Sequence, residues 1–206
     1  RDCRFKIRSN TLAFCDYRKS SAMPLSTPAP RQKKHTRTIS IEGFQRDDGL
    51  WDLEGCLTDV KTFDLDNAAK KRPAGSKHHE MFVRLTIDGA CNVCDIEVAS
   101  DSRPYDGYCE LTAPEYRKLI GLNLKRGFRK AVQERMGGIR GCTHITELIG
   151  TLPTAAFQSM AGSAGTPGSA EQKNMVLDRC AALERHGEVV KRYFPTWYVE
   201  PKDHGA

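Results

Sequence analysis

The first half of the chain alternates apolar and polar residues, which is typical of β-strands with one buried face. Four runs share this alternation: residues 35–42, 51–63, 81–87 and 93–98. Asp47-Asp48-Gly49 separates the first two runs, and Asp-Gly in such a position predicts a hairpin turn. The polar residues 64–78 read as a surface loop. The pattern therefore predicts a mainly antiparallel sheet of about four strands.

The second half changes to helical spacing. Pro114 stands at an early helix position, and a further helix carries Phe128, Val132 and Met136 on one face. A last helix is predicted at about residues 143–160, with Pro153 expected to kink or split it. The fold class is therefore α+β, with C-terminal helices packed on the sheet.

Composition changes divide the chain into four segments. Residues 1–34 form a basic leader expected to be disordered, and Met23 inside it is a candidate for the true start. A single α+β domain is predicted at residues 35–160, and the Gly/Ala/Ser-rich residues 161–174 read as a flexible linker. Residues 175–206 are predicted to form a C-terminal helix and an aromatic tail.

Charge and cysteine usage narrow the class of protein. The 206 residues carry a net charge of +6, but the cations concentrate in the leader, which favours a solvated tail over a nucleic-acid groove. No apolar run approaches the roughly 20 residues that cross a bilayer. The 8 cysteines follow no secretory signal, so reduced thiols in a soluble cytoplasmic protein are expected.

The most concentrated chemistry lies at Gly141-Cys142-Thr143-His144. Cys142 follows a Gly-rich turn and precedes a helical pattern, so it is expected at a helix N-terminus, where the helix dipole lowers a thiol pKa. A thiolate serves as either a nucleophile or a metal ligand, and His144 lies in the same first turn. The alternative is a buried structural cysteine beside a histidine bonded to backbone.

Other candidates stand at the ends of predicted strands. Cys109 closes a loop between sheet and helix, and His79 opens the strand at residues 81–87. Either could instead be an ordinary loop residue. Asp59, Glu97 and Glu147 are candidates for outer groups that orient a histidine through hydrogen bonds, although most such carboxylates are solvated. Cys91-Asn92-Val93-Cys94 has redox-like spacing but no helix start, so it is a weak candidate.

Two resemblances add to these patterns. The stretch from Gly43 through Trp51, together with Pro104-Tyr105 and the motif Gly141 to His144, resembles a bacterial domain-of-unknown-function family, number 2889, over residues 35–158. The resemblance implies a place in aromatic-compound or acyl-CoA catabolism without naming a step.

The order of elements also resembles the U-type iron–sulfur cluster assembly scaffolds. Those proteins have one Cys before a strand, a second after the next strand, and an adjacent His-Cys pair at a helix start. Here His79 stands in the first Cys position, and Cys142-Thr143-His144 replaces the adjacent pair. Two thiolates and two imidazoles suit zinc or iron better than a donated cluster.

Three hypotheses about function follow. The first is a metal-binding protein in which His79, Cys109, Cys142 and His144 hold Zn or Fe, or a labile Fe–S cluster, for delivery or catalysis. The second is a metal-free enzyme with Cys142 as nucleophile and His144 as base, acting on a small acyl or aromatic metabolite. The third is a binding module with a protein partner and no catalysis.

Overall fold

The computed structural model describes residues 25–66, 70–162 and 170–201. The chain divides into two units, Arg1–Lys33 and Lys34–Ala206. The expectations about Met23 and residues 1–24 lie outside the described residues, as does half of the predicted linker, residues 163–169. Among the described helices, none has the length and apolar character needed to span a membrane.

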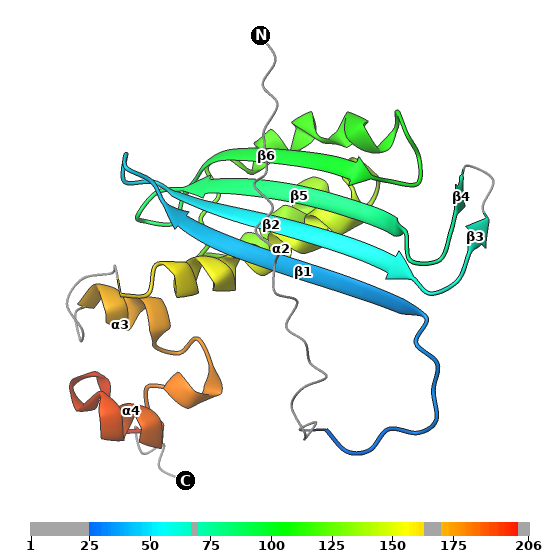
Figure 1. The fold of residues 1–206 in the computed structure, drawn as a ribbon. Coiled ribbons are helices and arrows are strands. Elements are labelled where there is room, and N and C mark those ends of the chain that lie inside the picture. The colour runs from blue at the N-terminus through cyan, green and yellow to red at the C-terminus, as the bar shows by residue number, and fades with distance from the viewer. Residues whose placement is uncertain (1–24, 67–69, 163–169, 202–206) are drawn as a thin grey trace. The chain divides into compact units, whose positions relative to one another are not determined.

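The larger unit contains a four-stranded antiparallel sheet, as the alternation predicts (Figure 1). Its strands are β1 (His35–Gln45), β2 (Trp51–Lys61), β5 (Lys77–Ile87) and β6 (Val93–Ser102), in the order β1-β2-β5-β6. In the turn between β1 and β2, the Asp48 carboxylate accepts the Leu50 N–H at 3.2 Å. The hairpin prediction is therefore confirmed, because consecutive strands pair along their whole length.

The loop predicted at residues 64–78 contains more structure than expected. A two-stranded ribbon of β3 (Leu65–Asp66) and β4 (Lys71–Arg72) occupies it, and β5 already begins at Lys77. Backbone pairing in so short a ribbon requires no apolar side chains, so the hydrophobic pattern carries no signal for it.

Helices follow the sheet in the order η1 (Cys109–Thr112), η2 (Pro114–Leu119), α1 (Phe128–Met136), η3 (Gly138–Arg140), α2 (Thr143–Ser159), α3 (Ala170–Val176), η4 (Ala181–Leu183), α4 (Glu188–Tyr193) and η5 (Pro195–Trp197). The segment that begins at Pro114 is a 3₁₀ helix rather than an α-helix, and it ends before Ile120. The helix α2 runs through Pro153 without splitting.

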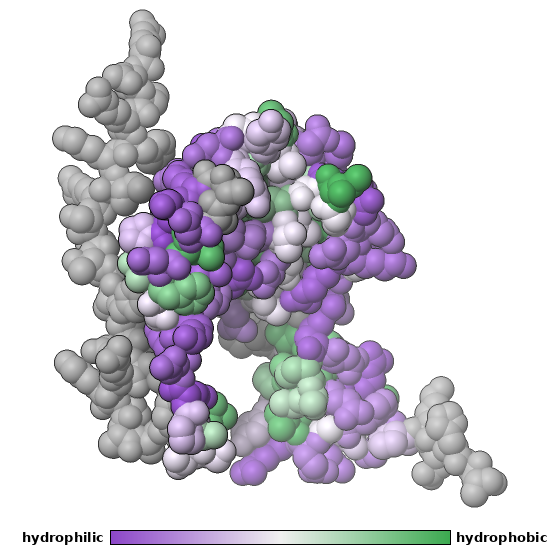
Figure 2. Space-filling view, turned by 90° about the vertical axis from the view of Figure 1, so that its right-hand side faces the viewer, coloured by the Kyte–Doolittle hydropathy of each residue, from purple (hydrophilic) through white to green (hydrophobic). Residues whose placement is uncertain are grey.

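The core lies between one face of the sheet and α2. Along β2, buried residues alternate with half-buried ones, and the buried set faces the helix. Gly55 lets α2 approach closely, because a Cβ at this position would stand 3.1 Å from Leu148 Cδ1. On the side shown in Figure 2, hydrophilic residues predominate and hydrophobic ones form separate patches. Inside the molecule, the apolar side chains of the sheet, of η2, of α1 and of α2 pack into one core.

Candidate functional site

A polar row crosses the buried face of the sheet at one end. Arg37 on β1 lies opposite Asp59 on β2, and Asp59 lies opposite His79 on β5. Because Arg37 has the same strand parity as Ile39 and Ile41, its side chain points to the α2 face. The sheet thus places three polar side chains in one row beneath the beginning of α2.

Asp59 is the centre of this row, and its side chain is only 5% exposed. The guanidinium of Arg37 binds the carboxylate with two donors, Nε to Oδ1 and Nη2 to Oδ2, each at 2.8 Å. His35 Nε2 lies 2.7 Å from Oδ1, and His79 Nδ1 lies 3.0 Å from Oδ2. Both carboxylate oxygens therefore have partners: Oδ1 has them from β1, and Oδ2 has them from β1 and β5.

His144 reaches the same carboxylate from α2. Its Nε2 lies 3.6 Å from Asp59 Oδ2, and its ring stacks on that of His79 with centroids 3.8 Å apart. The other ring nitrogen, Nδ1, lies 3.9 Å from Cys142 Sγ. One imidazole therefore stands between the buried carboxylate and a thiol.

A side chain from η2 and a glycine fix the start of α2. Cys142 is the N-cap residue, as the sequence predicts, and the Tyr116 hydroxyl bonds both its N–H and its carbonyl at 2.9 and 3.0 Å. Gly141 fits there because it lacks a Cβ, which would come 2.6 Å from the Met136 carbonyl oxygen. The hydroxyl of Tyr116 and the close backbone approach at Gly141 thus hold the Gly-Cys-Thr-His motif in position.

The electrostatics keep the carboxylate charged and the imidazoles neutral. Burial raises the pKa of Asp59, but the hydrogen bonds from Arg37 and His35 outweigh it and hold that pKa well below its ordinary value. Burial, with the charge of His144, lowers the pKa of His79 to about 4. Burial and then Arg37 lower the pKa of His144. At neutral pH the site therefore offers one carboxylate and two lone pairs on nitrogen.

Asp59, His79 and His144 form a group that could hold a metal ion. One ligand atom from each lies within 4.8 Å of the other two. A divalent ion bonds such atoms at about 2.0–2.2 Å, so two ligands of one ion are at most about 4.4 Å apart. The spacing of the three atoms is close to this limit. Two imidazoles and a carboxylate form a donor set that suits Zn²⁺ and Fe²⁺.

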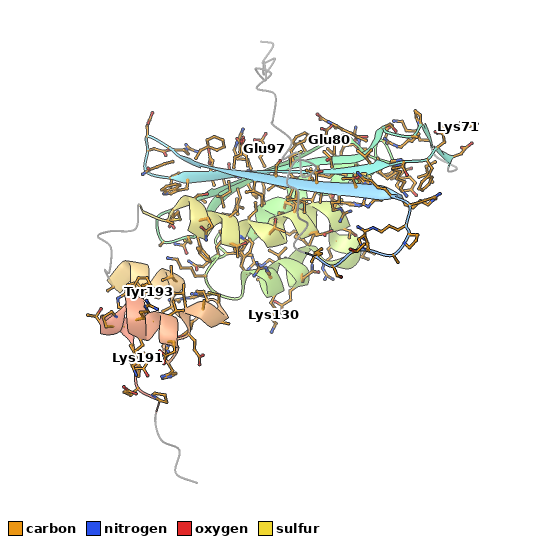
Figure 3. The ribbon with its side chains drawn as sticks, turned by 60° about the horizontal axis from the view of Figure 1, so that its bottom comes forward. Lys71, Glu80, Glu97, Lys130, Lys191 and Tyr193 are labelled. Carbon is orange, nitrogen blue, oxygen red and sulfur yellow. The ribbon has the colours of Figure 1, made fainter. Side chains whose placement is uncertain are left out.

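The structure brings some of the predicted site residues together and separates others. His79 and His144 lie in the group, and Asp59, predicted as an outer partner, stands at its centre. Glu147 contacts the group through Arg37, whose Nη1 lies 2.5 Å from Glu147 Oε2. Glu97 lies on the opposite face of the sheet (Figure 3). It pairs there with Arg84.

One of the two predicted thiols lies beside the group, and the other shares a pocket with it. Cys142 is adjacent to His144, and Cys109 shares with Cys142 the wall of an open pocket of about 460 Å³. That pocket is lined by Tyr105, Tyr108, Cys109, Thr112, Gly141 and Cys142. Neither thiol belongs to the group of atoms within 4.8 Å, so the predicted four-residue ligand set stays a prediction.

His35 and Arg37 are functional candidates that the sequence patterns missed. Both share a strand face with Ile39 and Ile41, so strict alternation through residue 35 would have directed them inward. A histidine and an arginine directed at a buried face require a polar partner, and that partner is Asp59.

The fold and site define a two-layer α+β protein with a buried Asp/His group at the junction of sheet and helix. The chain belongs to the family described as protein of unknown function DUF2889, whose model matches residues 35–158. No curated protein matches it. No solved structure matches it either, so the likeness to iron–sulfur scaffolds is not confirmed.

Proposed function

We propose that this protein binds one divalent transition-metal ion, Zn²⁺ or Fe²⁺, through Asp59, His79 and His144. The observation that supports the proposal is the convergence of one atom from each residue within 4.8 Å. The charge states of the three side chains suit this role, because metal ligation requires an ionised carboxylate and neutral imidazoles. Relative to the set expected from sequence, the two histidines remain and Asp59 replaces the thiolates.

Three protein ligands leave coordination positions for water or a substrate, as in catalytic rather than structural zinc sites. In this proposal Cys142 is an outer partner of the metal site, because a ligating histidine commonly bonds through its second ring nitrogen to a neighbouring group. The role supported by this arrangement is metal-dependent catalysis or metal delivery, and a step in aromatic or acyl-CoA catabolism fits the family resemblance.

Metal binding by the purified protein tests the proposal. Metal-free protein is titrated with Zn²⁺, and separately with Fe²⁺ under anaerobic conditions, and bound metal is counted after gel filtration. Wild type should retain one ion per chain, and Asp59→Asn and His79→Ala should lose it. His186→Ala is the matched control, because His186 bonds to a backbone carbonyl in the C-terminal segment. Equal retention by all variants would place the ion elsewhere and reject this site.

A second candidate function rests on the order Cys142, His144, Asp59. The imidazole lies 3.9 Å from the thiol and 3.6 Å from the carboxylate, which resembles the nucleophile, base and orienting acid of acyl-transfer enzymes. Cys142 also lines the open pocket, so an acyl or aromatic electrophile has access to its sulfur.

Alkylation kinetics at neutral pH test this candidate. Cys142 should react with iodoacetamide about tenfold faster than the exposed Cys180, and His144→Ala should remove the advantage. Equal rates at Cys142 and Cys180 in wild type would exclude an activated nucleophile. The measurement is made in a chelator, so that a bound metal does not block the imidazole.

A further inference from the structure

Arg37 is hydrogen-bonded to Asp59, the carboxylate that the proposed metal would bind. Its guanidinium donates to both oxygens of Asp59, each at 2.8 Å, so neither oxygen is free of a cation. An arginine guanidinium is charged at any working pH. A divalent ion at Asp59 Oδ2 would stand close to this positive charge, and the two cations would repel.

Glu147 offers the guanidinium a second anion. It lies on α2 one turn after His144, and its Oε2 accepts a hydrogen bond from Arg37 Nη1 at 2.5 Å. The Arg37 side chain is 29% exposed, whereas Asp59 is almost fully buried. The partly exposed guanidinium can therefore release Asp59 and remain paired with Glu147, while Asp59 stays in the core.

We infer that Arg37 is a built-in competitor of the metal: it holds Asp59 in the metal-free protein and moves toward Glu147 when an ion binds. This inference rests on the proposed function. The competition has two physical consequences. The buried carboxylate is never without a positive partner, which avoids the cost of an uncompensated buried charge. The affinity for metal is lower than the ligand set alone would give.

Affinity measurements on charge variants test the inference. Metal-free wild type, Arg37→Gln and Glu147→Gln are titrated with Zn²⁺ in competition with a chromogenic chelator. Arg37→Gln should bind about tenfold more tightly than wild type, since the competitor is gone. Glu147→Gln should bind several-fold more weakly, because Arg37 then has Asp59 as its remaining anchor. Arg84→Gln is the control: it removes an arginine paired with Glu54 and Glu97 on the opposite face.

The outcomes separate this inference from the proposed metal site. If wild type binds Zn²⁺ through Asp59 and Arg37→Gln binds equally or more weakly, Arg37 supports the site and the competitor is rejected. If neither protein shows binding that Asp59→Asn removes, the metal site itself is rejected. If Arg37→Gln binds Zn²⁺ and wild type does not, both the metal site and the role of Arg37 as a competitor are supported. Arg37→Lys keeps the charge without the two-pronged contact and should fall between wild type and Arg37→Gln, which gives a second reading if the glutamine variant fails to fold.

Discussion

Replacing Asp59 with Asn removes one charge from the centre of the site and keeps the side chain's shape. The amide offers one acceptor where the carboxylate offers two, and its NH₂ would face the Arg37 Nη2 donor that now bonds Oδ2 at 2.8 Å. His79 Nδ1, 3.0 Å from the same oxygen, would also lose its anionic partner. Asp59→Asn should therefore destabilise the metal-free protein.

The magnitude follows from these contacts. Hydrogen bonds to a charged group contribute about 1.5–3 kcal/mol each, and a buried donor left without a partner costs about 1–3 kcal/mol. Arg37 and His79 are 29% and 20% exposed, so water recovers part of the loss. We expect a net cost of about 2–4 kcal/mol. For a domain of this size that lowers the melting temperature by roughly 5–12 °C.

Thermal unfolding by circular dichroism in a chelator measures this cost. Asp95→Asn is the control, because Asp95 pairs with Arg117 at 2.9 Å on the surface and should cost at most about 1 kcal/mol. A melting temperature for Asp59→Asn within about 2 °C of wild type would refute the reasoning, since the central carboxylate would then contribute no net stability.

The difference in stability between wild type and Asp59→Asn should depend on pH, and the direction of the change follows from the pKa of Asp59. The folded pKa of Asp59 lies below its unfolded value of about 3.9, so the folded state favours the ionised form. The stabilising contribution is present above the unfolded pKa and is lost as pH falls through the folded pKa. The gap between wild type and Asp59→Asn should thus be full at neutral pH and narrow below about pH 4.

Three further predictions concern metal, packing and the helix start. Saturating Zn²⁺ at 100 times its dissociation constant should stabilise wild type by about 2.7 kcal/mol in a thermal melt, and His144→Ala should remove this shift. Gly55→Ala should cost about 1–3 kcal/mol in urea unfolding, because the new Cβ would stand 3.1 Å from Leu148 Cδ1; Leu148→Ala should cost about 2–5 kcal/mol, and the double variant less than the sum. Gly141→Ala should weaken Zn²⁺ binding as well as stability, since its Cβ would meet the Met136 carbonyl at 2.6 Å and shift the start of α2; unchanged Zn²⁺ affinity would contradict this role.

The order of strands and helices was predictable because local patterns encode it. Alternation in β2 leaves Leu53 and Leu57 buried and their neighbours half-buried, and the sheet has the expected antiparallel form. The failures are local too. Short pairing in β3 and β4 and the 3₁₀ geometry after Pro114 depend on backbone hydrogen bonds, which side-chain periodicity does not report.

The candidate site was only partly predictable. His79 and His144 stand out by residue type and position, but 64 residues lie between them, and the sequence gives no measure of which partners either one meets. Asp59 is one of many carboxylates on the predicted strands, and Arg37 is one of many cations in the N-terminal part of the chain. Only the pairing register shows that Arg37, Asp59 and His79 form one row.

The sequence by itself determined the period of each element, the residues at its buried face and the position of Cys142 at a helix start, since these follow from chain-local geometry. The tertiary structure decided which of the many polar groups share one buried point. That choice depends on strand register and on how closely α2 approaches the sheet, and both are set by long-range packing around residues such as Gly55 and Leu148. A carboxylate, an arginine and two imidazoles then acquire linked charges and pKa values that none of them has as an isolated residue.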